Sequence, residues 1–229
     1  MTGERTITFD PHVHTDASYD AEGSVHKVLA CCHNSPLDAV AITDHDTTLA
    51  AREALEQQDR YDVTVVPGVE ISTADGHLLA LGVVDRPPIG RSLADTVRWV
   101  RTEGGVAVVP HPFQVSRYGV RKRDLVPCDG IEVFNAWSMA GIQNRRAEAF
   151  ASEREYTALG GSDAHDSTMI GQGYTEVDVT LPDGDLTPAR ILAGIRAGRT
   201  RAVGNTTSKT KYLSKYTRTV RDRMAKRVR

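Results

Sequence analysis

The sequence predicts an α/β protein in which strand–helix units form an irregular, barrel-like domain. Short apolar, β-branched segments alternate with segments of helical periodicity through most of the 229 residues, which is typical of parallel βα units. The length is sufficient for one large core, and barrels of this size commonly form a single domain. The content of 40% hydrophobic and 25% charged residues fits a soluble globular protein.

The expected strands are short runs rich in Val, Ile, Leu and Ala. In chain order they cover Thr6–Phe9, Ala39–Thr43, Val63–Val66, Leu78–Val84, Val106–Val109, Gly130–Phe134 and Thr157–Leu159. The expected helices cover Ser24–His33, Thr48–Gln58, Leu93–Glu103, Ala140–Arg154 and Pro188–Ala197. The last helix has proline in its first turn and ends before Gly198, as helix ends commonly do.

One connection departs from the alternation. Only eleven residues separate the third expected strand from the fourth, and the five from Ser72 to Gly76 form the turn between them. A parallel crossover needs a dozen or more residues, so we expect a hairpin here and an irregular barrel.

The charge distribution divides the chain at Gly204. Residues 205–229 carry nine Lys or Arg side chains and a single acidic one, Asp222, although the whole chain has a net charge of −2. We therefore expect a barrel over residues 1–204 and a basic C-terminal extension over 205–229. A basic segment on an acidic body indicates contact with RNA or DNA. The alternative is a solvated terminal helix that carries no function.

The sequence shows no feature of a secreted or membrane protein. The first ten residues lack the apolar stretch of a secretory signal, and no apolar run approaches the ~20 residues that cross a bilayer. Three cysteines, two of them adjacent (Cys31 and Cys32), form no zinc-ribbon spacing. We expect reduced thiols in a cytoplasmic protein.

Six of the eight histidines fall at the ends of expected strands, where α/β barrels assemble their active sites. They are His12, His14, His45, His77, His111 and His165. In the segment from His12 to His14, two imidazoles at i and i+2 point to the same side of an extended chain. Each histidine alone is as compatible with a core or loop role. Together with Glu70 and Asp163, the set predicts a centre for divalent cations. The absence of thiolate ligands favours manganese, zinc or iron.

These motifs resemble those of the PHP (polymerase and histidinol phosphatase) superfamily. They are His12-Val13-His14-Thr15, Ile42-Thr43-Asp44-His45-Asp46-Thr47-Thr48, Pro67-Gly68-Val69-Glu70-Ile71-Ser72, His111-Pro112 and Gly161-Ser162-Asp163-Ala164-His165. The resemblance covers roughly residues 9–175. It is closest to the small stand-alone PHP phosphoesterases that act on nucleotides or short RNA. It implies a distorted (β/α)7 TIM-like barrel with up to three divalent metal ions.

The resemblance also implies the site residues. The metal ligands would be His12, His14, Asp20, His45, Glu70, His77, His111, Asp163 and His165. Asp16 is the alternative to Asp20, because the segment before Asp20 is one residue longer than the common family spacing. A hydroxide bridging two metals would attack the phosphate, and Asp163 would also steer the water. Arg117 and Asn135 are the expected substrate-binding residues, and a solvated loop is the alternative for Arg117.

Three functions follow from these residues. The first is a metal-dependent phosphoesterase acting on a nucleotide or short oligonucleotide. The second is a small-metabolite phosphomonoesterase, such as a histidinol-phosphate phosphatase. The third is a non-catalytic metal-binding scaffold module, which the retention of all nine ligand positions disfavours.

Overall fold

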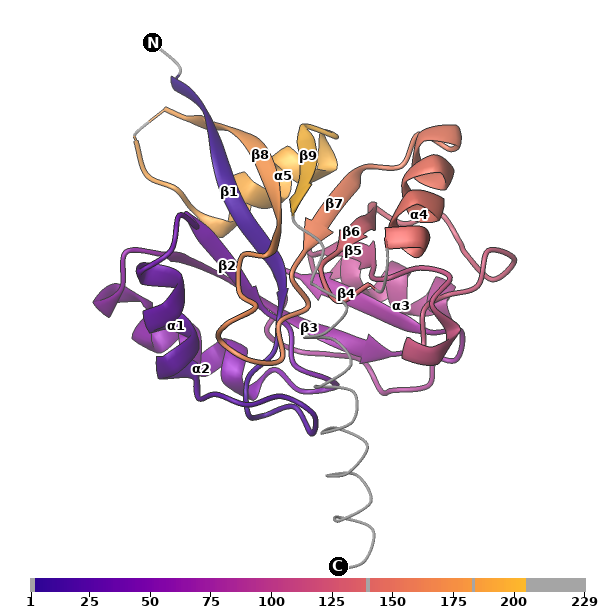
Figure 1. The fold of residues 1–229 in the computed structure, drawn as a ribbon, viewed down its shortest axis with the longest axis horizontal. Coiled ribbons are helices and arrows are strands. Elements are labelled where there is room, and N and C mark those ends of the chain that lie inside the picture. Colours follow the sequence, from indigo (N-terminus) through magenta and orange to yellow (C-terminus); the bar gives the residue numbers. More distant parts are fainter. Residues whose placement is uncertain (1–2, 139–140, 183, 205–229) are drawn as a thin grey trace, which may run out of the picture.

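The computed structural model describes residues 3–138, 141–182 and 184–204 (Figure 1). The basic extension predicted at residues 205–229 lies outside the described residues. Within the described part, nine strands form one sheet in the order β7-β6-β5-β4-β3-β2-β1-β8-β9. The strands are β1 (Gly3–Val13), β2 (Ala39–Ile42), β3 (Thr64–Ser72), β4 (His77–Leu81), β5 (Val106–Val109), β6 (Gly130–Asn135), β7 (Ala158–Gly161), β8 (Gly173–Leu181) and β9 (Thr200–Gly204).

Five α-helices surround this sheet in the described residues. They are α1 (Val25–His33), α2 (Leu49–Gln57), α3 (Leu93–Thr102), α4 (Ile142–Glu153) and α5 (Pro188–Arg196), with short 3-10 turns η1 (Gln58–Arg60) and η2 (Val115–Arg117). Serine hydroxyls begin two of the helices, since Ser24 accepts from the backbone of Lys27 and Ser92 from that of Asp95. None of the described helices is long and apolar enough to cross a membrane.

Strand directions confirm the predicted hairpin and limit the predicted parallel pairing. β1, β2 and β3 are parallel, as are β5, β6 and β7. β4 lies antiparallel to both β3 and β5, which is the consequence of the short connection after Ser72. β8 is antiparallel to β1, and β9 is antiparallel to β8.

The sheet curls until its two ends nearly meet, so that it forms a distorted barrel. At one point β1 contacts the segment after β7, where the His14 N–H donates to the Ala164 carbonyl at 2.9 Å. At another, the N–H of Gly160 in β7 donates to the hydroxyl of Thr175 in β8 at 2.9 Å. The predicted TIM-like α/β fold is therefore confirmed.

The core has an inner part and two outer layers. Residues from seven strands, such as Phe9, Leu79 and Val108, pack inside the barrel with Ile191 and Ile195 of α5. Arg196 at the end of α5 donates to the carbonyls of Gly104 and Gly105, directly before β5, so α5 covers the end of the barrel at which this strand begins. The other end, where the parallel strands finish, carries the polar residues. Outside, α1 and α2 pack on β1–β3, and α3 and α4 pack on β4–β6.

The sequence did not predict β8 and β9. In β8 the buried side chains Val177, Val179 and Leu181 alternate with polar ones, so no continuous apolar run is present. β9 is short, and its residues are half-buried or exposed. The expected strands β1 and β3 are longer than predicted, because both continue past their apolar runs into the polar end of the barrel.

Candidate metal centre

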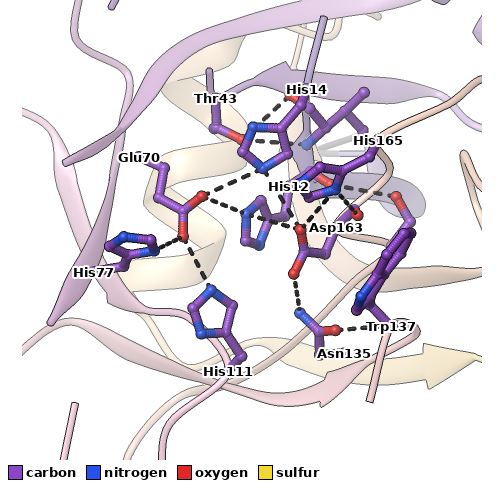
Figure 2. Close-up of polar contacts among 12 residues, drawn as sticks. His12, His14, Thr43, Glu70, His77, His111, Asn135, Trp137, Asp163 and His165 are labelled. Carbon is purple, nitrogen blue, oxygen red and sulfur yellow. Dashed lines mark hydrogen bonds and ion pairs between the residues drawn. The ribbon is translucent and has the colours of Figure 1, made fainter. Parts of the chain in front are cut away.

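Glu70 lies at the centre of the polar end, with 1% of its surface exposed, and both carboxylate oxygens contact imidazoles (Figure 2). Its Oε1 lies 2.7 Å from Nδ1 of His77 and 3.0 Å from Nε2 of His111. Its Oε2 lies 3.2 Å from Nε2 of His12, 3.3 Å from Nε2 of His14 and 3.2 Å from Nδ1 of His45. One buried carboxylate therefore connects five histidines that come from four segments of the chain.

Asp163 forms a second contact point beside Glu70. Its Oδ1 lies 3.6 Å from Nε2 of both His12 and His14 and 3.4 Å from Nδ1 of His165. Its Oδ2 accepts hydrogen bonds from Arg117 at 2.5 Å and from the Asn135 amide at 2.8 Å.

Asp20 lies between the two remaining predicted ligands. Its carboxylate oxygens lie 3.6 Å from Nε2 of His45 and 3.5 Å from Nε2 of His165. Asp16 is exposed. Of the two aspartates that the sequence left open, Asp20 is the one whose carboxylate contacts these imidazoles. All nine predicted ligands therefore converge on one site.

Two groups orient the imidazoles of His12 and His14. Nδ1 of His12 lies 3.1 Å from the buried carboxylate of Glu132, and Nδ1 of His14 lies 3.1 Å from the Ser18 hydroxyl. Ser18 donates its own proton to Asp44 at 2.7 Å, so it accepts from His14. With the proton on Nδ1, each ring can present the lone pair of Nε2 to a cation at the centre. This is the arrangement that carboxylates and hydroxyls impose on metal-binding histidines.

Sequence reasoning missed Glu132. The residue lies within the apolar strand β6, between Ile131 and Val133, and its carboxylate also accepts from the His111 N–H at 2.8 Å. A carboxylate inside a short buried strand is the signal that could have identified it, because such a group must be paired.

Several residues of the site have a backbone conformation that is rare for side chains other than glycine. The φ angles are 54° at Asp46, 30° at His111 and 53° at Asp163. Such conformations cost of order 1–3 kcal/mol each and cluster at functional sites. At Asp46 the conformation is held by hydrogen bonds from the backbone and hydroxyl of Ser72, both of 2.7 Å.

The carboxylates of the centre are held in the ionised form. Burial alone would raise the pKa of Glu70, but the surrounding imidazoles, first those of His77 and His45, hold it well below its usual range. Burial likewise opposes ionisation of Asp163, and Arg117 and His12 outweigh it to lower the pKa of that carboxyl. Ionised carboxylates are what cation binding requires.

The residues present fit divalent cations. Nε2 of His14 and Oδ1 of Asp163 are buried, have no hydrogen-bond partner among the described residues and face each other at 3.6 Å. Two ligands of one tetrahedral ion, each ~2.1 Å from it, lie about 3.4 Å apart. Four groups of three residues each offer ligand atoms within 4.8 Å of one another: His12, His14 and Glu70; His12, His111 and Asp163; His14, His45 and His165; and His45, Glu70 and His77.

The two predicted substrate-binding residues lie beside this centre. The side chain of Arg117 is 17% exposed, pairs with Asp163 and lies over the ring of Trp137, 5.7 Å from its centroid. Asn135 is fully buried, and its amide group donates to both Glu132 and Asp163. These contacts favour a positioning role for Asn135, and its contact with substrate stays a prediction.

Two family models match the chain. The model of the PHP domain matches residues 10–157, and a model described as PHP-associated matches residues 141–200. Every predicted metal ligand except Asp163 and His165 lies in the first segment.

Individual proteins are also similar to this chain. An uncharacterized protein of Methanocaldococcus jannaschii is 33% identical over 150 residues, 60% of this chain and 87% of that protein. The phosphoribosyl 1,2-cyclic phosphate 1,2-diphosphodiesterase of Eggerthella lenta is 35% identical over 85 residues, only 34% of this chain and 32% of that enzyme. A two-domain protein of Bacteroides vulgatus, described as containing a predicted PHP-like metal-dependent phosphoesterase, has the same fold. Its TM-score is 0.72 at 19% identity, over 94% of this chain and 70% of that chain.

Proposed function

The chain belongs to the PHP domain family of metal-dependent phosphoesterases, and we propose that it hydrolyses a phosphate ester of a nucleotide or short oligonucleotide at the cluster around Glu70. The observation that carries this proposal is the contact of one buried carboxylate with five imidazoles. Such a cluster does not stabilise a purely structural core, because each buried ionisable group costs free energy unless it is paired or binds a metal.

The nine ligands divide into three groups, and Glu70 belongs to two of them. In this proposal the first ion is held by His12, His14, Glu70 and Asp163, the second by Glu70, His77 and His111, and the third by Asp20, His45 and His165. When bound, such cations polarise phosphate oxygens and lower the pKa of water. The mixed nitrogen and oxygen ligands suit manganese, zinc or iron.

The protein's own groups position the reactants. Oδ1 of Asp163, which has no hydrogen-bond partner among the described residues, can accept a hydrogen bond from the attacking water. Arg117 lies within reach of the same carboxylate and carries a planar guanidinium suited to two phosphate oxygens. Ser138, with a buried hydroxyl that likewise lacks a described partner, is a further donor toward substrate.

A second candidate substrate is a small phosphorylated metabolite. The relative from Eggerthella lenta is named for the hydrolysis of a phosphoribosyl cyclic phosphate, which is a diester of a small sugar. The cation cluster would serve either substrate, since it contacts only the phosphate.

The test is phosphate or nucleotide release from a panel of esters by the protein loaded with manganese, zinc or iron. The panel contains a chromogenic phosphomonoester, a phosphodiester, an adenosine bisphosphate, 5′-phosphorylated RNA and histidinol phosphate. Glu70→Gln is compared with Glu56→Gln, which changes an exposed residue of α2 in the same way. We expect release that a chelator abolishes, that Glu70→Gln lowers at least 100-fold and that Glu56→Gln leaves intact.

Two results would contradict the proposal. Hydrolysis that persists in chelator and in Glu70→Gln would place the reaction elsewhere. Cation binding without hydrolysis of any ester would make the chain a binding module. Preference for histidinol phosphate over the nucleotides would select the metabolite substrate.

A further inference from the structure

A cavity of about 690 Å³ opens beside His77, one of the predicted metal ligands. Its walls are the hairpin of residues 72–77 and the loop of residues 115–124, and Tyr19 completes the lining. The backbones of the two walls are joined, because the His77 N–H donates to the Tyr118 carbonyl at 2.9 Å. A ligand in this cavity would therefore contact the same hairpin that supplies His77 to the candidate metal centre.

Two large aromatic side chains line the cavity although both are exposed to solvent. The ring of Tyr118 is stacked on His77, with centroids 5.4 Å apart, and that of Tyr19 is stacked on His45 at 5.1 Å. Their exposed fractions are 67% and 59%. An aromatic ring fixed on one face and open on the other can stack on a base, an interaction worth about 1–3 kcal/mol per base.

The loop is built to hold Tyr118 in place. Its φ angle is 56°, a conformation that tyrosine rarely adopts. A side chain on the following Gly119 would lie 2.3 Å from the carbonyl oxygen of His111, so the loop packs tightly against the segment that carries that ligand. Strain of this kind persists only where the surrounding contacts enforce it.

Among the described residues, the charged side chains of the cavity leave one cation without a partner. Asp75 accepts from the N–H of Leu93 at 2.8 Å, and Arg123 lies 3.5 Å from Asp124. The side chain of Arg121 makes no ion pair or hydrogen bond with the described residues, and only its carbonyl accepts, from the Asp124 N–H at 2.9 Å. Arg121 also lines a neighbouring cavity of about 470 Å³, together with Lys122 and Arg146. It therefore borders both cavities.

We propose that this cavity binds the part of the substrate beyond the cleaved phosphate, with Tyr118 stacking on an aromatic base and Arg121 binding a second phosphate. The inference rests on the proposed phosphoesterase function and adds the residues that select its substrate. The preferred ligand is then a nucleotide that carries two phosphates, as a nucleoside bisphosphate or within an oligonucleotide.

The test for Arg121 compares adenosine 3′,5′-bisphosphate with the adenosine 3′- and 5′-monophosphates. We expect Arg121→Gln to lower the ratio of kcat/KM for the bisphosphate to that for the better monophosphate about 10- to 100-fold, the range for one lost charge-assisted contact. Arg98→Gln, which removes an exposed arginine of α3, should leave the ratio unchanged. The Kd of the bisphosphate, measured by calorimetry in chelator, should rise by a similar factor in Arg121→Gln.

The test for Tyr118 compares adenosine monophosphate with glycerol phosphate, which has no ring. Tyr118→Ala should lower the preference for the adenosine ester about tenfold, and Tyr118→Phe should keep it. An unchanged ratio and an unchanged Kd in Arg121→Gln, or an unchanged preference in Tyr118→Ala, would overturn the inference. Absence of turnover of every ester by the metal-loaded wild type would instead overturn the proposed function, and the Kd in chelator would still decide the role of Arg121.

Discussion

Replacing Glu132 by glutamine tests the orientation of the ligands without removing any ligand. The carboxylate of Glu132 is 1% exposed and accepts three hydrogen bonds. The donors are Nδ1 of His12 at 3.1 Å, the backbone N–H of His111 at 2.8 Å and the Asn135 amide at 2.8 Å. Glutamine has the same shape but offers one acceptor oxygen and one NH2 group.

The expected loss of cation affinity and of kcat/KM follows from the pairing of these donors with the NH2 group of glutamine. Because three donors face Glu132, at least one of them meets the NH2 group of glutamine in either orientation of the amide. A buried hydrogen bond to a charged group contributes about 1.5–3 kcal/mol, and ~1.4 kcal/mol corresponds to a factor of ten. We therefore expect cation affinity and kcat/KM to fall about 10- to 100-fold, as is usual when the partner of a metal-binding histidine is removed.

The assay is competition with a chromogenic chelator at fixed pH, followed by steady-state kinetics. Glu148→Gln, an exposed change on α4, is the matched control and should bind cations as the wild type does. Thermal unfolding shows whether the variant is folded at the assay temperature. If folded Glu132→Gln bound the cation within a factor of two of the wild type, the orienting role of Glu132 would be refuted.

Three further results are expected. Arg117→Ala should raise KM for a phosphate ester about 10- to 100-fold, because a charge-assisted phosphate contact is lost; an unchanged KM would leave Arg117 as a solvated loop residue. A chelator should lower the Tm of metal-loaded protein by about 5–10 °C. A free cation at ~100 times its Kd stabilises the folded state by about 2.7 kcal/mol, which corresponds to a Tm shift of this size for a chain of this length; calorimetry that shows no shift would contradict tight binding. Burial raises the pKa of the Cys128 thiol to about 12, so iodoacetamide at pH 8 should modify the partly exposed Cys31 first, and mass spectrometry that finds Cys128 modified first would contradict this.

The gathering of the ligands could be predicted because it depends on a regular property of the fold. Parallel strands end at one side of a barrel, and the polar residues that follow each apolar run must meet there. His45, His111 and Asp163 follow this rule directly. The hairpin after Ser72 could also be predicted, because the length of a connection limits the direction of the next strand.

The contacts between residues far apart in the chain could not be predicted. Arg117 reaches Asp163, 46 positions along the chain, through a loop whose length and conformation no short pattern specifies. The amide group of Asn135 donates to both Glu132 and Asp163, and no pattern in the sequence indicated these two contacts. Such pairings depend on how strands and loops pack, and periodicity reports only which face of a strand a residue occupies.

The hairpin that interrupts the parallel order is also what completes the centre. β3 pairs in parallel with β2 over Thr64–Pro67 on one edge, and antiparallel with β4 from Gly68 onward on the other. Gly68 permits the close approach of β4, because a side chain there would lie 2.9 Å from the Ala80 carbonyl oxygen. The antiparallel pairing places Glu70 opposite Leu79, and His77, two residues earlier in β4, reaches its carboxylate at 2.7 Å. A regular parallel crossover at this point would carry the next strand away from Glu70. The irregularity of the barrel is therefore what brings His77 to Glu70, and the absence of a side chain at Gly68 leaves the room for it.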